Sequence, residues 1–313
     1  MKKKIDTLLI GLGNIGMESD YRIKINKSSF LTHSSTLHNH KSFRLVAAVD
    51  LIERKRKKFL QKFKIATYKN LSIAMTKTKP LLIILAINTP NILILLKKII
   101  EHKNIKYILF EKPLTSNIKK FVKIKRLLNK NKINFLINFQ RSYNPIYLKN
   151  LKKIFKYKGK KKIIIYFTRD FLSNASHFLF LITPYIQNKF VIFKKNNNVY
   201  LKTNNLEIIF IKLNFIYSEN KMEIYSDNYM IRLVNRNENF QFYKVVKDRI
   251  YSNTKILKKK RFYSQIHIII KNFVYDYLYE IIHKNKKNTN FNKIFEKYFK
   301  ILSNINLNET KKI

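Results

Sequence analysis

The stretch LLIGLGNIGM, residues 8–17, holds three of the four glycines of this 313-residue chain, at Gly11, Gly13 and Gly16. Average usage is about 7% glycine, so the chain avoids this residue almost everywhere else. Proline and tryptophan are also scarce, whereas lysine, isoleucine and asparagine, whose codons are AT-rich, are abundant. A glycine kept against this background indicates a requirement of the backbone.

These glycines directly follow an apolar run, residues 5–12, that predicts a buried strand. In a nucleotide-binding turn the first glycine makes the tight turn, the second admits a pyrophosphate, and the third lets the helix pack closely on the strand. The N–H groups at the start of that helix then face the anion. The pattern predicts a dinucleotide site made by Gly11, Gly13, Asn14, Ile15 and Gly16. The alternative is a glycine-rich turn with a structural role only.

An acidic residue, Asp50, ends the second apolar run, residues 43–50. A carboxylate at this position hydrogen-bonds the adenosine ribose, although a surface turn or helix cap is the alternative. Asp50 follows Gly16 by 34 residues, whereas about 20 is common. We therefore expect an insertion, the polar residues 17–29. Asp50 favours NAD, while Arg54 or Lys55 leaves NADP open.

The first half of the chain alternates apolar runs with amphipathic stretches. Strands are predicted at 5–12, 43–50, 81–88, 105–113 and 133–139, and helices at 51–63, 91–103 and 117–131. Continuous apolar strands between helices indicate a parallel sheet covered on both faces. We predict an N-terminal doubly wound Rossmann domain over residues 1–137.

The second half contains successive strand patterns separated by short polar breaks. They lie at 161–167, 190–195, 198–203, 207–217, 222–227 and 229–235, and helical patterns follow at 263–284 and 291–305. This order predicts a C-terminal α/β domain, residues 138–313, built on a large, mainly antiparallel open sheet.

The net charge of +47 and the pI near 10.2 suggest a polyanion as partner. The lysines, however, run along the whole chain and form no single stripe, so we expect no specific nucleic-acid binding and only weak, salt-sensitive adhesion. The same field would favour an anionic small substrate. There is no cysteine, and no apolar run reaches the roughly 20 residues that span a bilayer. We expect a cytoplasmic protein with no membrane span and no metal site.

Two further motifs carry candidate chemistry. FEKPLTSN, residues 110–117, ends the fourth predicted strand, where open parallel sheets bind ligands. Its lysine, Lys112, can transfer a proton, and the charge of Glu111 can hold that lysine in place. The alternative is an ordinary strand end with no role in catalysis. DFLSNASHFLFL, residues 170–181, places His177 between small polar residues and an apolar run. Histidine suits acid–base work on an alcohol, although the pattern by itself favours a structural histidine.

Together these motifs resemble the glucose–fructose oxidoreductase/inositol dehydrogenase family, Gfo/Idh/MocA, along nearly the whole chain. LLIGLGNIG, LTHSSTLHNHKSFRLVAAVD, FEKPLTSN, LINFQRSYNP, SNASHFLFL and MEIYSDNYMIRL occur in the family's order. The resemblance implies a Rossmann domain with NAD or NADP, a second α/β domain whose sheet often forms a homo-oligomer, and a sugar or cyclitol substrate. The form of the insertion and of SNASH is most similar to a branch associated with surface polysaccharides.

The resemblance also implies roles for residues. Lys112 and His177 match the family's catalytic residues, Glu111 belongs to the cofactor side, and Arg141, Tyr143 and Asn174 would contact substrate. Three positions depart from the family pattern: Ser173 and Phe180 replace frequent aspartates, and Ile94 replaces a frequent histidine. The proton relay would then consist of Lys112 with His177 and Asn174, or be impaired.

Two hypotheses follow from the sequence. The first is an NAD(P)-dependent oxidoreductase that exchanges a hydride with a carbinol or ketone carbon of a sugar, sugar nucleotide or cyclitol. The second is a non-catalytic nucleotide-binding or regulatory protein that keeps the fold. The intact Glu-Lys-Pro motif and His177 favour the first, and the missing carboxylates favour the second.

Overall fold

The computed structural model describes residues 4–22, 30–87, 92–215, 220–234, 239–251, 253–263, 266–284 and 289–310. Side chains are described over the same ranges except 266–272, 284, 289–290 and 306–310. The chain forms two compact units. The first comprises Met1–Thr115, Lys119–Asn138 and Lys271–Asn292, and the second comprises Ser116–Ile118, Phe139–Ile270 and Lys293–Ile313. The chain thus returns to the first unit after 270, whereas the sequence-based division uses a single boundary after residue 137.

The first unit is built on a six-stranded sheet in the order β3-β2-β1-β4-β5-β6, in which all pairs of neighbours are parallel. Its strands are β1 (Ile5–Ile10), β2 (Phe43–Val49), β3 (Thr67–Tyr68), β4 (Leu82–Leu85), β5 (Tyr107–Phe110) and β6 (Asn134–Ile137). This is the order of a doubly wound dinucleotide-binding sheet, so the predicted Rossmann fold is confirmed. The short β3 escaped prediction because two residues carry no readable pattern.

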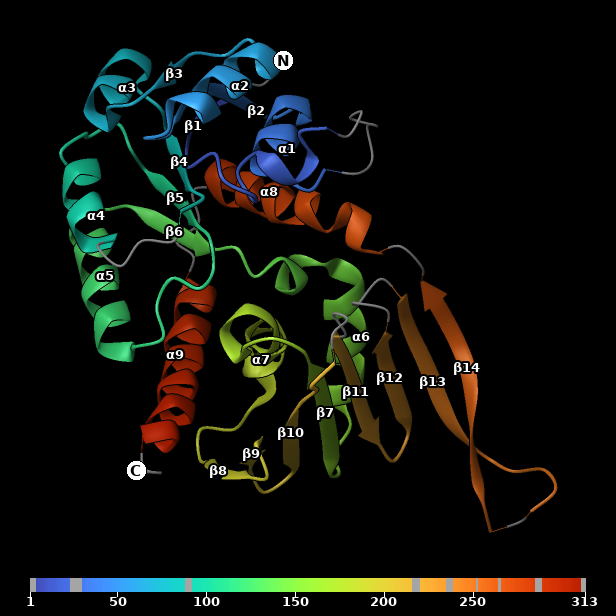
Figure 1. Ribbon diagram of the computed structural model, residues 1–313. Coiled ribbons are helices and arrows are strands. Elements are labelled where there is room, and N and C mark those ends of the chain that lie inside the picture. The colour runs from blue at the N-terminus through green and yellow to red at the C-terminus, as the bar shows by residue number, and fades with distance from the viewer. Residues whose placement is uncertain are drawn as a thin grey trace. The chain divides into compact units, whose positions relative to one another are not determined.

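Helices cover both faces of this sheet. They are α1 (His33–Asn39), α2 (Glu53–Phe63), α3 (Leu71–Thr78), α4 (Ile92–Ile100), α5 (Ile118–Lys130) and α8 (Ile266–Lys284). In Figure 1, α4 and α5 lie on one side of the strands, and α1 and α8 on the other. The amphipathic pattern explains the packing: α5 buries Phe121, Ile124 and Leu128 at helical spacing and exposes its lysines.

The first helix of this sheet is divided by the insertion that the spacing of Asp50 predicts. The backbone N–H of Met17 donates to the carbonyl of Gly13, which starts a helical turn. The N–H groups of His33 and Ser34 then donate to the carbonyls of Ile15 and Gly16, so α1 continues the turn after the loop. A short 3₁₀ turn, η1 (Glu18–Asp20), lies between the two pieces.

Asp20 fixes the base of this insertion. Its buried carboxylate accepts hydrogen bonds from the N–H groups of Leu31 and Thr32 and from the hydroxyls of Thr32 and Ser35, at 2.7–3.0 Å. Thr32 is also the N-cap of α1, because its hydroxyl accepts from the Ser35 N–H. Asp20 thus joins the segment before residues 23–29 to the start of α1.

The second unit is built on an eight-stranded sheet in the order β14-β13-β12-β11-β7-β10-β9-β8. Its strands are β7 (Lys161–Phe167), β8 (Val191–Lys195), β9 (Asn198–Lys202), β10 (Leu206–Lys212), β11 (Asn220–Ser226), β12 (Tyr229–Val234), β13 (Asn239–Lys247) and β14 (Lys255–Tyr263). Only β7 and β10 pair in parallel; the other pairs are antiparallel, as predicted. The hairpin β13–β14 forms one edge (Figure 1).

Helices of the second unit pack through aromatic contacts. They are α6 (Pro145–Lys156), α7 (Ser176–Ile182) and α9 (Thr289–Thr310), with short helical turns η2 (Gln140–Tyr143), η3 (Phe171–Ala175) and η4 (Thr183–Tyr185). Tyr147 of α6 stacks on Phe240 of β13, with ring centroids 5.7 Å apart. Phe180 of α7 stacks on Phe139 at 4.1 Å and on Phe295 of α9 at 5.1 Å.

Candidate functional site

The three clustered glycines meet different requirements. Gly11 has φ +98°, which side-chain-bearing residues rarely adopt, and a Cβ there would lie 2.6 Å from the carbonyl oxygen of Ala86. A Cβ at Gly16 would overlap the carbonyl oxygen of Gly11. The fold itself therefore requires both residues to be glycine. These are the tight turn and the close helix–strand approach that the pattern predicts.

Gly13 is different, because no contact with the described residues requires it to be glycine. Its φ lies outside the left-handed range, and of the described residues only Lys55 comes within 4 Å of a Cβ, through the flexible end of its side chain at 3.8 Å. In a chain with four glycines in 313 residues, this open space needs another explanation. It matches the position at which a bound pyrophosphate approaches the backbone.

Asp50 lies at the end of β2, beside the glycine turn. Its Oδ2 accepts a hydrogen bond from the Leu12 N–H at 2.7 Å, and its Oδ1 accepts from the Ile52 N–H at 2.8 Å. Arg56 donates to the carbonyls of Asp50 and Leu51. The carboxylate therefore ties the glycine turn to the β2–α2 loop, and its oxygens keep lone pairs for further donors such as a ribose hydroxyl.

A hollow of about 540 Å³ opens at the carboxyl ends of β1, β2 and β4. Gly11 and Asp50 belong to its wall, and most of the other lining residues are apolar: Ile10, Val49, Leu51, Ile52, Leu71, Ile87 and Leu95. Lys69 and Lys98 add positive charge at its edge. A cavity of this size, with apolar walls and few polar groups, suits the planar base and ribose of a nucleotide.

Glu111 and Lys112 follow β5, and Glu111 makes contacts that the sequence did not reveal. Its Oε1 lies 2.7 Å from the Nε2 of buried His33 and accepts from the Asn138 Nδ2 at 2.5 Å. His33 also lies 2.5 Å, through its Nδ1, from the hydroxyl of buried Tyr275. These partners stand 78, 27 and 164 residues from Glu111 in sequence, and no sequence spacing links His33 or Tyr275 to Glu111.

The remaining predicted residues belong to the second unit. His177 lies on α7, half-buried, with its ring edge-on to Phe139 at 6.0 Å. Asn174 lies on η3 and donates to the Thr168 carbonyl at 2.5 Å. Tyr143 is buried on η2. The structure thus groups Gly11, Gly13, Gly16 and Asp50 around one edge of the first sheet, and His177 and Asn174 on adjoining turns of the second unit.

Arg141 is an unusual cation in this group. Burial lowers the pKa of its guanidinium, with neighbouring Tyr147 acting in the opposite direction. Its carbon Cζ lies 5.2 Å from the ring centroid of Phe178. Its buried Nε has no hydrogen-bond partner within the described part of the chain. Asn138 Oδ1, Ser142 Oγ and Asn144 Nδ2 share this state, so buried unpartnered polar atoms are concentrated at 138–144, where native proteins have few.

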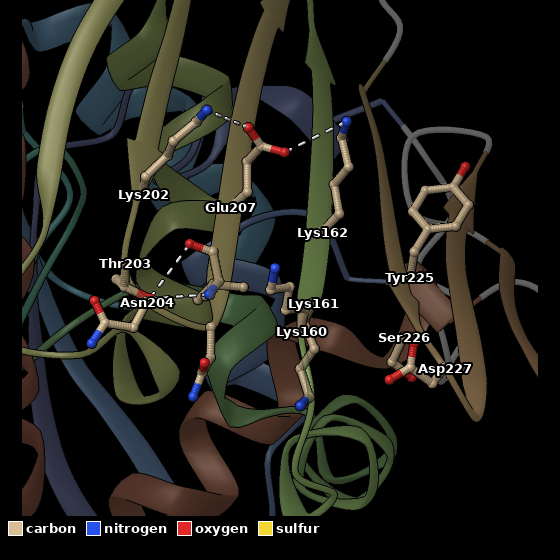
Figure 2. Close-up of a pocket in the computed structure, with 12 residues that line it drawn as sticks. Lys160, Lys161, Lys162, Lys202, Thr203, Asn204, Glu207, Tyr225, Ser226 and Asp227 are labelled. Atoms are coloured by element: carbon tan, nitrogen blue, oxygen red, sulfur yellow. Dashed lines mark hydrogen bonds and ion pairs between the residues drawn. The ribbon is translucent and has the colours of Figure 1, made fainter.

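A second hollow, of about 490 Å³, lies on the second unit and is rich in lysine (Figure 2). Glu207 pairs there with Lys202 at 3.0 Å and with Lys162 at 3.5 Å. Lys161 donates to the carbonyls of Tyr157 and Gly159. Because these charges are already compensated by protein groups, this hollow is the weaker candidate for a ligand site.

The described ranges contain neither a metal-binding cluster nor a membrane-spanning helix. No group of three or more His, Cys, Asp and Glu side chains there has a geometry that could hold a metal ion. None of the helices in the same ranges combines the length and the apolar composition that crossing a bilayer needs.

Comparisons with known proteins agree with this geometry. Residues 5–139 match the family model GFO_IDH_MocA, described as an oxidoreductase family with an NAD-binding Rossmann fold. No curated protein matches the sequence.

Solved structures share the fold at low identity. A dehydrogenase, MviM, from Clostridium difficile is 17% identical with a TM-score of 0.71, over 97% of this chain and 99% of its own. A dehydrogenase from Chromobacterium violaceum is 11% identical, with a TM-score of 0.69, over 97% and 94%. A variant of KijD10, a 3-ketoreductase from Actinomadura kijaniata in complex with TDP-benzene and NADP, is 10% identical with a TM-score of 0.71, over 96% of each chain.

The glycine turn, Asp50 and the Glu-Lys-Pro strand end all lie within the matched residues 5–139, in the arrangement that a dinucleotide site requires. This part of the sequence matches the model of the Gfo/Idh/MocA family of oxidoreductases with an NAD-binding Rossmann fold.

Proposed function

We propose that this chain is an NAD(P)-dependent dehydrogenase or reductase that acts on a carbinol or ketone carbon of a sugar, sugar nucleotide or cyclitol. The observation that carries the proposal is the open space at Gly13. The fold explains Gly11 and Gly16, and a ligand that must approach the backbone would explain the absent side chain at Gly13.

The residues around this space fit a dinucleotide. Gly13, Asn14 and Ile15 begin the helical turn, whose N–H groups suit the pyrophosphate. Asp50 would accept from the adenosine ribose, and the apolar hollow beside it would take the adenine. Asp50 favours NAD, while Arg54 or Lys55, in the first turn of α2 after Asp50, would accommodate the added phosphate of NADP.

The chemistry of the chain's own residues would be proton transfer and positioning. The bound dinucleotide supplies hydride transfer at its nicotinamide ring. Lys112 and His177 are proposed to share the proton of the substrate hydroxyl, because an alcohol loses a hydride only as its proton is taken up. Asn174, which stands three residues before His177, would orient the same hydroxyl. Glu111 would hold the main chain that carries Lys112.

The state of Arg141 favours an anionic substrate, such as a sugar nucleotide or an acidic sugar. The buried Nε of this cation has no hydrogen-bond partner in the described part of the chain, and a polar group buried without a partner is costly. A phosphate or carboxylate can accept from a guanidinium in bidentate fashion. Arg141, with neighbouring Tyr143, would therefore contact the charged part of the substrate.

The second sheet is proposed to mediate a homo-oligomer. Its edge strand β14 leaves Ile256, Leu257 and Phe262 exposed, at 46%, 44% and 46% of their surface. Such edges are commonly covered by another chain. Light scattering of the purified protein should give a mass of at least two chains, and a monomer at micromolar concentration would contradict this part.

The function is tested with a panel of sugar nucleotides, acidic sugars, neutral sugars and polyols, each with NAD and NADP, followed at the nicotinamide absorbance. We expect turnover with at least one anionic sugar, and we expect Lys112→Met and His177→Ala to lower it by about 10²–10⁴-fold. Dinucleotide binding with no turnover on any substrate would favour the alternative, a non-catalytic nucleotide-binding protein. Turnover of neutral polyols only would contradict the role of Arg141.

A further inference from the structure

A buried chain of hydrogen bonds connects four separate segments of the first unit. It runs from Tyr275 on α8 to His33 on α1, then to Glu111 after β5, with Asn138 after β6 joining at the same carboxylate oxygen. His33 and Tyr275 are each 0% exposed. The other carboxylate oxygen, Oε2, lies 3.3 Å from the backbone N–H of Lys112, which donates to it. The network therefore ends on the main chain of Lys112.

The protonation states in this chain are mutually consistent. Burial, together with the charge of Glu111, raises the pKa of the Tyr275 hydroxyl well above its usual range, so the phenol keeps its proton. A phenol that donates to the His33 Nδ1 leaves the proton of the imidazole on Nε2, which then donates to Glu111. The Tyr275 hydroxyl, both ring nitrogens of His33 and the Glu111 carboxylate all have hydrogen-bond partners, which helps a buried network to hold one arrangement.

Glu111 is thereby held at both of its carboxylate oxygens. One oxygen receives His33 and Asn138 from the scaffold, and the other receives the amide of the next residue. A carboxylate with only the Lys112 contact could adopt several rotamers. The scaffold contacts select one rotamer, and so they select one position for the peptide that carries Lys112.

Two residues of the network lie at or near positions where the chain passes from one unit to the other. Asn138 is the last residue of the first unit before the chain enters the second, and Tyr275 follows its return at Lys271 by four residues. Both connections are thus tied to the carboxylate beside Lys112. This placement gives α8 a role that its amphipathic pattern does not disclose.

We propose that His33, Tyr275 and Asn138 are positioning residues that hold Glu111 and, through it, the main chain of Lys112 in the arrangement that proton transfer needs. This proposal rests on the proposed function of Lys112. None of the three is a catalytic residue. Removing any of them should loosen the segment 107–115 without removing the dinucleotide site around Gly13.

The test uses Tyr275→Phe, which deletes one hydroxyl, with Tyr279→Phe as matched control one helical turn further along α8. His33→Leu is compared with His38→Leu from the same helix, and His33→Gln should restore part of the effect, because its amide can still donate to Glu111. Amide hydrogen exchange of the full chain, without cofactor or substrate, measures the opening of segment 107–115. Melting temperature and NAD(P) affinity are measured alongside.

We expect Tyr275→Phe and His33→Leu to speed exchange in 107–115 by about tenfold, the loss that one hydrogen bond brings. The two control variants should leave it unchanged, and kcat should fall with the cofactor affinity preserved. Unchanged exchange in Tyr275→Phe would overturn the proposal. So would faster exchange throughout the first unit with a lower melting temperature and unaltered kcat, because that describes a merely structural role. If the wild type turns over no substrate, the proposed function fails while the exchange result stands.

Discussion

Two hollows of similar volume, one in each unit, differ in the chemical groups that line their walls. The hollow of the first unit, about 540 Å³, is lined by strand ends, apolar side chains and Asp50, beside a glycine turn with unoccupied space above Gly13. The hollow of the second unit, about 490 Å³, is lined by four lysines whose neighbours include Glu207 and Asp227 (Figure 2). Because the chain carries a net charge of +47, a group of lysines is weak evidence for a ligand site. The space above Gly13, which contacts within the described residues do not explain, is stronger evidence.

The largest effect is expected at Gly16, because there the fold and the first hollow depend on the same glycine. A Cβ at Gly16 would overlap the Gly11 carbonyl oxygen, and backbone atoms cannot move aside as a flexible side chain can. We expect Gly16→Val to lower the free energy of unfolding by several kcal/mol, in the range of severe core overpacking. Chemical denaturation measures it. A Gly16→Val variant as stable as the wild type would contradict this prediction, because it would mean that the turn can hold a side chain.

A smaller and more selective effect is expected at Asp50. Asp50→Ala removes two carboxylate hydrogen bonds to the Leu12 and Ile52 N–H groups, each worth about 1.5–3 kcal/mol for a charged acceptor. It also removes the acceptor proposed for the ribose hydroxyls. Calorimetric titration should therefore show that NAD affinity falls more than NADP affinity, by about tenfold. Equal losses for both dinucleotides would mean that Asp50 serves only to hold the turn.

The smallest effect is expected in the second hollow. The hydrogen bond from Lys202, then the attraction of Lys202 and Lys162, lower the pKa of the Glu207 carboxyl. A lowered folded-state pKa adds stability above the unfolded value, near pH 4.3, and this stability is lost as pH falls through the folded value. We expect less than about 1 kcal/mol, as for other solvent-screened pairs.

The matched variant for this pair is Glu207→Gln. Its melting temperature should differ from that of the wild type at pH 7 and converge with it below about pH 4. A difference that persists unchanged at pH 3 would show that packing of the side chain, and not its charge, stabilises the sheet there.

The sequence predicted the first sheet well because its strands are continuous apolar runs ended by the residues of the site. It also located the insertion, since the spacing from Gly16 to Asp50 is too long for one uninterrupted helix. The strand β14 was missed for a physical reason: it places lysine on both faces and is exposed along nearly its whole length, so no alternation of apolar and polar residues marks it. The strand β13 was missed although its buried Phe240 and Phe242 alternate with half-buried residues.

The contacts of Glu111 were beyond reach from the sequence for a different reason. His33 and Tyr275 are 242 residues apart, and neither stands in a motif with catalytic spacing. Their meeting depends on the continuation of the first helix after its insertion and on the return of α8 to the first unit. Both are properties of tertiary packing, which local pattern does not encode.

The central claim is that the space above Gly13 is reserved for a dinucleotide, and Gly13→Val tests it most directly. Among the described residues, a Cβ there would approach only the end of Lys55, so the variant should fold with a nearly unchanged melting temperature, while its side chain fills the place proposed for the pyrophosphate. Calorimetry with NAD and NADP should show binding to the wild type. In Gly13→Val the affinity for both dinucleotides should fall by at least about 100-fold, because the valine side chain would overlap the pyrophosphate. A folded Gly13→Val variant that binds either dinucleotide as tightly as the wild type would contradict the account.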